Sequence, residues 1–172
     1  MKKRSIVILM IVLIAGMGFS VQAQNLKFGH INSQELLKAM PENDSAQAEM
    51  QRFAQQLQDQ MDELQVEFNK KLQDYQAQQG QLTDLIRKTK EEELANLQKN
   101  IQDFQAGAQQ EMQKKQQELM QPIIDKANKA IKDVARENGF IYIFDIAGGT
   151  ILYYSEKSVD ILPLVKKKLG IE

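Results

Sequence analysis

The sequence of 172 residues contains no cysteine and no tryptophan, and it has a single histidine, His30. The absence of cysteine excludes a disulfide scaffold, a cysteine nucleophile and a thiolate metal site. One histidine also excludes a metal centre built from several histidines. Three prolines and nine glycines are too few for a β-sandwich with many turns. The formal charge of −1 provides no basic surplus, so a nucleic-acid partner is not expected.

Residues 1–23 have the three parts of a secretory signal peptide. Three basic residues at positions 2–4 precede an apolar run over residues 6–17, which is too short to span a bilayer comfortably. Val21 and Ala23 suit the −3 and −1 positions, so cleavage is expected after about Ala23. The alternative, a buried core helix, is weaker because a charged start so directly precedes the run. Removal of the segment leaves 19 Lys and Arg against 23 Asp and Glu, a formal charge of −4.

The middle of the chain, residues 43–138, is dominated by Gln, Glu, Lys, Leu and Ala, which favour helix. Its apolar residues recur with a period of eleven, which corresponds to about 3.67 residues per turn and predicts nearly straight helices. Each helix is expected to bury a narrow apolar stripe and to leave a broad polar face. The first stripe consists of Met50, Phe53, Leu57, Met61, Leu64, Phe68, Leu72 and Tyr75. The second consists of Leu97, Ile101, Ala108, Met112, Leu119, Ile123, Ala130 and Val134.

A turn within residues 79–83 would fold these helices into an antiparallel hairpin. Gly80 interrupts a run of glutamines there, and Thr83 can cap the returning helix. Thr89 with Glu92 offers a second capping box, and hence an alternative turn.

The turn at 79–83 places Pro41 and Pro122 at the same level of the hairpin. Pro41 suits the start of a helix, whereas Pro122 is expected to kink the returning helix. The arm, residues 44–119, is about 54 Å long at 1.5 Å per residue over its first helix. Two helices of this length have no deep core, so the arm must project from a separate body.

Residues 24–43 and 120–172 are expected to form this β-containing body. A strand is predicted over residues 27–31, followed by a helix over residues 34–40 with Asn32 or Ser33 as its cap. Asn138 and Gly139 end the long helix in the manner typical of C-caps.

The C-terminal part of the body is predicted to contain a β-hairpin and a final helix. Residues 140–144 and 150–154 favour strands, and residues 147–149 would join them as a turn. The final helix is expected over residues 159–169, with Gly170 at its end and Lys166 to Lys168 complementing its dipole. The predicted fold class is mainly α with a small β body (α+β). A long antiparallel helical hairpin would project from a short-stranded, oligomeric β core.

Residues 140–144 are apolar at every position, so both faces of this strand should be buried. One subunit hardly supplies enough cover for them, which predicts self-association through the strands. The residues expected in this oligomer core are Ile141, Ile143, Ile151 and Tyr153.

Side chains that could support catalysis are scarce. His30 is expected to be structural, and Glu91 to Glu93 to lie on a solvated helical face. Gly148 and Gly149 lack the helix and lysine that follow a phosphate-binding loop. No enzyme activity, no cofactor and no metal site are therefore predicted.

The tip of the hairpin is the clearest candidate contact surface. Apolar and basic residues lie together there and could touch apolar chains or anionic head groups. They fit ordinary hairpin packing with solvated basic side chains equally well. The tip set consists of Leu82, Leu85, Ile86, Arg87, Lys88 and Lys90.

The layout resembles that of the Skp (OmpH) family of periplasmic chaperones. Two segments carry most of this resemblance, PIIDKANKAIKDVARENGF at residues 122–140 and SVDILPLVKKKLGI at residues 158–171. One departure is Leu162, where the family often has a threonine that caps the last helix, a role that Asp160 can take.

The resemblance implies a homotrimer shaped like a jellyfish, located in the periplasm. Strands of three subunits would form its body, and three hairpins would surround a cavity that holds unfolded outer-membrane proteins without ATP. It also implies contact with lipopolysaccharide. Two other classes remain open: a coiled-coil structural spacer of the cell envelope with fixed partners, and an enzyme, which would need a pocket that the sequence does not indicate.

Overall fold

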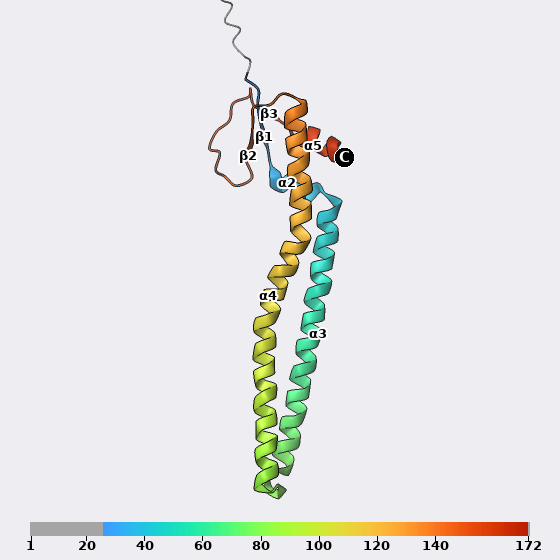
Figure 1. Cartoon of the computed structure of the whole chain (residues 1–172), viewed down its shortest axis with the longest axis vertical. Helices are drawn as coiled ribbons and strands as arrows, with labels where there is room; N and C mark the ends of the chain where they lie inside the picture. The colour runs from blue at the N-terminus through green and yellow to red at the C-terminus, as the bar shows by residue number, and fades with distance from the viewer. Residues whose placement is uncertain (1–25, 172) are drawn as a thin grey trace, which may run out of the picture.

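The computed structural model describes residues 26–171. The predicted signal peptide and its cleavage site lie outside this range. The described chain consists of a long two-helix hairpin with a small α+β body at one end (Figure 1). None of the helices within residues 26–171 combines the length and the apolar character that a membrane crossing requires. The predicted fold class, mainly α with a small β body, is confirmed.

The hairpin is formed by α3 (Pro41–Gln78) and α4 (Asp84–Glu137), joined by the short 3₁₀ helix η1 (Gln79–Gln81). Pro41 is the first residue of α3, where its missing N–H is not needed. Thr83 is the N-cap of α4, and its hydroxyl accepts a hydrogen bond from the backbone N–H of Ile86 at 3.4 Å. Residues 79–83 therefore form the connection between the two helices.

Thr89 does not start a helix, so the alternative turn beside it is not formed. It lies in the second turn of α4 and donates a hydrogen bond to the carbonyl of Leu85 at 3.0 Å. Pro122 lies inside α4, which continues for fifteen more residues to Glu137. Packing in the body holds the helix together where the missing N–H of Pro122 leaves one backbone hydrogen bond unmade.

The body contains a three-stranded sheet with the order β2-β1-β3. Its strands are β1 (Phe28–Ile31), β2 (Tyr142–Asp145) and β3 (Val159–Asp160), and both outer strands are parallel to β1. The predicted β-hairpin is therefore wrong. Residues 150–154 form no strand, because two strands that run parallel to β1 need a long returning connection rather than a tight turn.

Two short helices complete the body. Helix α2 (Ser33–Ala39) follows β1, and its N-cap Asn32 accepts a hydrogen bond from the backbone N–H of Glu35 at 3.1 Å. Helix α5 (Leu162–Leu169) is shorter than predicted, because Val159 and Asp160 belong to β3. The Asp160 carboxylate accepts a hydrogen bond from the Leu162 N–H at 2.9 Å, as expected of a residue that replaces a capping threonine.

A single hydrophobic cluster holds together the sheet, the short helices and the C-terminal part of α4. Gly29, in the central strand, marks the tightest point: a Cβ built on it would lie 2.8 Å from Ile143 Cδ1. The buried apolar residues are Ile31, Leu36, Met40, Ala46, Ile123, Ala127, Ala130, Val134, Ile161, Leu162 and Val165. All of them belong to the body or to the adjoining ends of α3 and α4.

Candidate functional site

The apolar stripes of α3 and α4 face each other along the hairpin but are only half enclosed. From Met50 to Tyr75, every residue of the first stripe keeps an intermediate exposure. The physical reason is that each helix of a pair has one neighbour, whereas a helix in a globular core has several. The predicted helical stripes are thus present, and apolar surface remains accessible along the hairpin.

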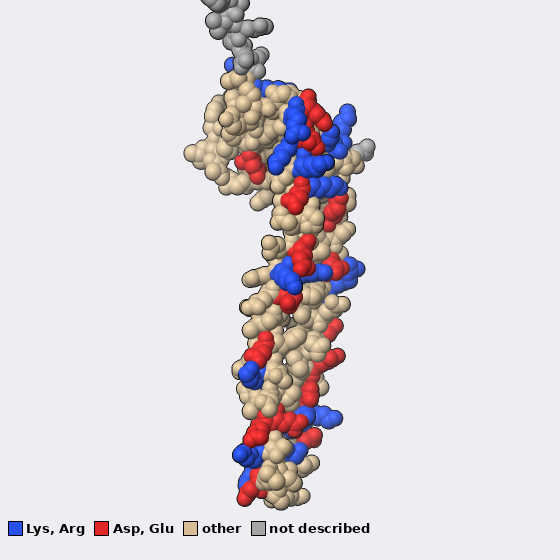
Figure 2. Space-filling model, in the orientation of Figure 1, with Lys and Arg blue, Asp and Glu red and all other residues tan. Residues whose placement is uncertain are grey.

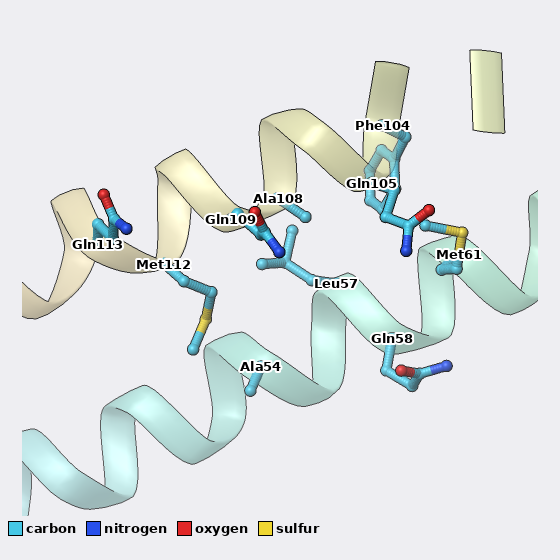
Figure 3. Close-up of a pocket in the computed structure, with 10 residues that line it drawn as sticks. All are labelled: Ala54, Leu57, Gln58, Met61, Phe104, Gln105, Ala108, Gln109, Met112 and Gln113. Atoms are coloured by element: carbon cyan, nitrogen blue, oxygen red, sulfur yellow. The ribbon is translucent and has the colours of Figure 1, made fainter. Parts of the chain in front are cut away.

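The middle of the hairpin contains an open groove of about 590 Å³, here called the mid-arm groove. In Figure 3, Leu57 of α3 points toward Ala108 and Gln109 of α4, and Met112 reaches from α4 toward Ala54. Methionine and leucine give the groove an apolar floor, and glutamines border it. The lining residues are Ala54, Leu57, Gln58, Met61, Phe104, Gln105, Ala108, Gln109, Met112 and Gln113.

The lining of the mid-arm groove is suited to contact rather than to catalysis. It contains no acid, base or nucleophile of the kinds that act in general acid–base or covalent catalysis. Methionine side chains have several rotatable bonds and adapt to irregular partners. The groove can therefore accept apolar side chains of different shapes.

A second groove lies at the base of the hairpin, with Pro41 and Pro122 both in its lining. The two prolines therefore lie at the same level, as the sequence indicated. Lys126 and Glu42 form an ion pair across this groove, linking α4 to α3. The hydrogen bond from Lys126 lowers the pKa of the Glu42 carboxyl below its ordinary value.

The tip set lies together within residues 82–90, at the end of the hairpin opposite the body. Leu85 is 77% exposed and Ile86 is 47% exposed, whereas Leu82 is half-buried. The structure thus leaves two large apolar side chains of the tip open to a partner.

The basic residues of the tip are balanced by acidic neighbours. Arg87 pairs with Asp84, and the Lys88 ammonium lies 3.9 Å from a carboxylate oxygen of Glu92. Lys90 is half-buried. The tip is consequently apolar with mixed charge, rather than a concentrated positive patch.

The residues predicted for an oligomer core are not brought together. Ile143 packs against the chain's own core above Gly29, while Ile141 and Tyr153 are exposed and Ile151 is half-buried in the loop after β2. Within β2, period-two alternation places Ile143 on the face opposite Tyr142 and Phe144. Ile141 lies just before this strand, and Ile151 and Tyr153 lie outside any strand.

An aromatic cluster that was not expected from the sequence lies on the face of the sheet opposite Ile143. The loop after β2 lies beside it, since Phe28 and Phe144 line a groove together with Tyr154. Phe28, Tyr142 and Phe144 stack there, with ring centroids 6.1–6.4 Å apart. All three are exposed, Tyr142 to 60%. The alternation of Tyr142 and Phe144 about Ile143 could have identified this face before the structure was known.

His30 lies beside this aromatic cluster and has a structural role. It is 8% exposed, its Nδ1 lies 2.9 Å from the Ser158 hydroxyl, and its ring stacks on Tyr154 at 4.1 Å between centroids. These contacts attach the loop after β2 to the sheet. Within residues 26–171, no group of three His, Cys, Asp or Glu residues is arranged to hold a metal ion.

Comparison with known proteins agrees with this architecture. The family model described as outer membrane protein (OmpH-like) matches residues 27–169. The crystal structure of a candidate outer membrane chaperone (OmpH-like) from Caulobacter crescentus CB15 is similar, with a TM-score of 0.73 and 12% identity over 84% of this chain and 83% of that one. No curated protein matches the chain. The resemblance carried by the two C-terminal segments is confirmed by the family match, and the chain belongs to the OmpH-like outer membrane protein family.

Proposed function

We propose that this protein is a periplasmic holdase chaperone, which binds unfolded outer-membrane β-barrel proteins without ATP and prevents their aggregation. The observation that carries the proposal is the long hairpin whose apolar stripe stays half-exposed over most of its length. Such a surface offers many weak contacts, which add up when one polypeptide engages several of them. Membership of the OmpH-like family supports an outer-membrane chaperone in general.

Three copies would assemble through the body, residues 24–43 and 120–172, and leave residues 44–119 as free arms. Support comes from the aromatic cluster of Phe28, Tyr142 and Phe144, which stays exposed although the loop after β2 lies beside it. Ile141, Ile151 and Tyr153 would extend this contact. Exposed apolar clusters of this kind commonly mark protein interfaces. The number three comes from the family resemblance.

The tip set would make the outermost client contact. Leu85 and Ile86 provide apolar surface, and Arg87, Lys88 and Lys90 would add attraction to acidic clients, anionic lipid or lipopolysaccharide. Reversing the charge of all three basic residues to Glu should weaken binding to clients or liposomes. Unchanged affinity would remove the tip from the mechanism.

The function is tested by diluting a urea-unfolded β-barrel protein into buffer and recording light scattering. Suppression by a stoichiometric amount of the mature protein, without nucleotide, supports the chaperone. Unaltered aggregation would refute it and favour the alternative, a coiled-coil structural spacer of the envelope with fixed partners. Sedimentation equilibrium of the same sample measures how many copies assemble.

A further inference from the structure

We propose that the mid-arm groove binds apolar segments of unfolded polypeptide that are flanked by Lys or Arg. This inference rests on the proposed chaperone function and names the class of client segment that the arm selects. It concerns a part of the arm that is separate from the tip set and from the body.

The groove exists because small and large side chains alternate where the helices meet. Ala54 and Ala108 leave space between Leu57, Met61 and Met112, and the floor therefore stays open. An apolar side chain inserted there would be removed from water on three sides, by α3, by α4 and by the floor. The contact is shallow, which suits a partner that must later be released.

The two helix segments that carry the groove are acidic. Residues 53–69 of α3 and residues 100–113 of α4 contain six carboxylates and no Lys or Arg. The six are Asp59, Asp62, Glu63, Glu67, Asp103 and Glu111. Figure 2 shows red side chains following the α3 edge at this level, with no blue among them. From just outside these ranges, Lys99 pairs with Asp103 and the Lys71 ammonium lies 3.7 Å from a carboxylate oxygen of Glu67. The Lys115 ammonium lies 5.7 Å from the centre of the Phe53 ring, at the body end of the groove. The negative charge beside the groove therefore rests chiefly on Asp59, Asp62 and Glu63.

The groove and the carboxylates are physically linked through glutamine. Gln58 borders the groove and donates a hydrogen bond from Nε2 to Asp62 at 2.8 Å. One turn earlier, Gln55 donates to Asp59 at 2.7 Å. These hydrogen bonds hold the carboxylates of Asp59 and Asp62 beside the rim of the groove. Charges interact through solvent over about 10 Å at about 0.1 M salt, so a charged residue on a bound segment would be attracted or repelled by them.

This charge distribution selects among the occupants of an apolar groove. A segment flanked by Asp or Glu would be repelled by the same carboxylates that attract a segment flanked by Lys or Arg. A second arm of this chain would bring an identical acidic surface, so arm-to-arm packing at this level is disfavoured. An apolar client segment with basic flanks can pack its apolar side chains on the floor of the groove and place its positive charges beside the carboxylates of the rim.

The test uses the full mature protein and two fluorescent peptides with the same apolar centre, one flanked by Lys and one by Glu. Fluorescence anisotropy should show about tenfold tighter binding of the Lys-flanked peptide at low ionic strength, from a few exposed charge pairs. High salt should reduce the difference to about twofold. Equal affinities at low ionic strength would overturn the inference.

Two sets of variants locate the effect. Asp59→Asn/Asp62→Asn/Glu63→Gln should abolish the preference while apolar binding remains. The control Asp74→Asn/Glu92→Gln/Glu118→Gln changes the net charge equally at exposed positions outside the acidic zone and should keep the preference. Loss of the preference in both sets would mean that it arises from net charge alone, and the inference would fail.

A third variant covers the case in which the neutralised protein folds poorly. Gln58→Lys/Gln105→Lys adds two positive charges at exposed rim residues and should reduce the preference for the Lys-flanked peptide. The control Gln76→Lys/Gln78→Lys adds the same charge near the tip and should leave the preference unchanged. If the wild-type protein suppresses aggregation but shows no preference, the inference is wrong and the proposed function stands. Absence of both overturns the proposed function itself.

Discussion

Replacing Gly29 with alanine tests how closely the body is packed around its central strand. Gly29 pairs with Ile143 on β2 and with Val159 on β3. An added Cβ would lie 2.8 Å from Ile143 Cδ1, and 3.1 Å from both Ile161 Cγ2 and Phe140 Cδ1. Three contacts at or below the normal limit mean that neighbouring side chains must move.

The size of the effect follows from two opposing contributions. Inserting a methyl group into a packed core costs about 1–3 kcal/mol. Replacing glycine in a strand recovers about 0.5–1 kcal/mol, because the unfolded chain loses freedom. Ile143 Cδ1 is the end of a side chain that can rotate, but Ile161 Cγ2 and Phe140 Cδ1 belong to stiffer side chains. The middle of the cost range, about 2 kcal/mol, therefore applies. The free energy of unfolding should therefore fall by about 1 kcal/mol.

Gly107→Ala provides a matched control with the opposite sign. Gly107 lies inside α4, and nothing lies within 4 Å of the position its Cβ would take. Alanine should therefore stabilise the helix by about 1 kcal/mol through its higher propensity. Because both variants replace glycine with alanine, their difference reports the packing around Gly29.

Urea unfolding followed by circular dichroism, at one fixed protomer concentration, measures both free energies. Hydrogen exchange on the same samples should place the change for Gly29 in the body and the change for Gly107 in the arm. A Gly29→Ala protein as stable as the wild type would refute the close packing of β1 against Ile143, Ile161 and Phe140.

Three further predictions concern the body. Burial raises the pKa of the Asp145 carboxyl, but hydrogen bonds from Ser33 and the Ala147 N–H outweigh it and leave that pKa below its ordinary value. The ionised Asp145 therefore stabilises the fold at pH values above the pKa that this carboxyl has in the unfolded chain. This stabilisation is lost as the pH falls through the lower pKa of the folded protein. Asp145→Asn should accordingly make the melting temperature less sensitive to acid. Asn32→Ala should reduce the free energy of unfolding by about 1 kcal/mol, measured in urea, with Asn32→Asp close to wild type. Phe144→Asp should lower the mass in sedimentation equilibrium, and an unchanged mass, equal to that of the arm variant Val66→Asp, would contradict assembly through the aromatic cluster.

The helical hairpin could be predicted from the sequence because its determinants are local. Helix propensity, the eleven-residue apolar period, Pro41 at the first position of α3 and Thr83 as the cap of α4 all act within a few residues. The same holds for Asn32 at α2 and Gly170 at the end of α5. No distant contact is needed to favour these features.

The sheet could not be predicted in the same way, because strand pairing joins distant residues. Residues 150–154 have strong β propensity but pair with no strand in the described chain. Val159 and Asp160 form a strand of only two residues, yet this strand pairs with β1. A run that is apolar at every position also gives no indication of which face is covered. The sequence predicts Ile143 for a subunit contact, and in the described chain its side chain packs against the chain's own core.

By itself, the sequence determined the two long helices, their turn and the lack of cysteine ligands and nucleophiles. These properties depend on residue type and on spacing along one helix. Only the tertiary structure decided that the sheet is parallel, that Phe28, Tyr142 and Phe144 form an exposed cluster, and that an apolar groove opens beside Asp62. The physical reason is that each of these features arises where segments far apart in the chain meet, and their relative position is set by packing rather than by local preference.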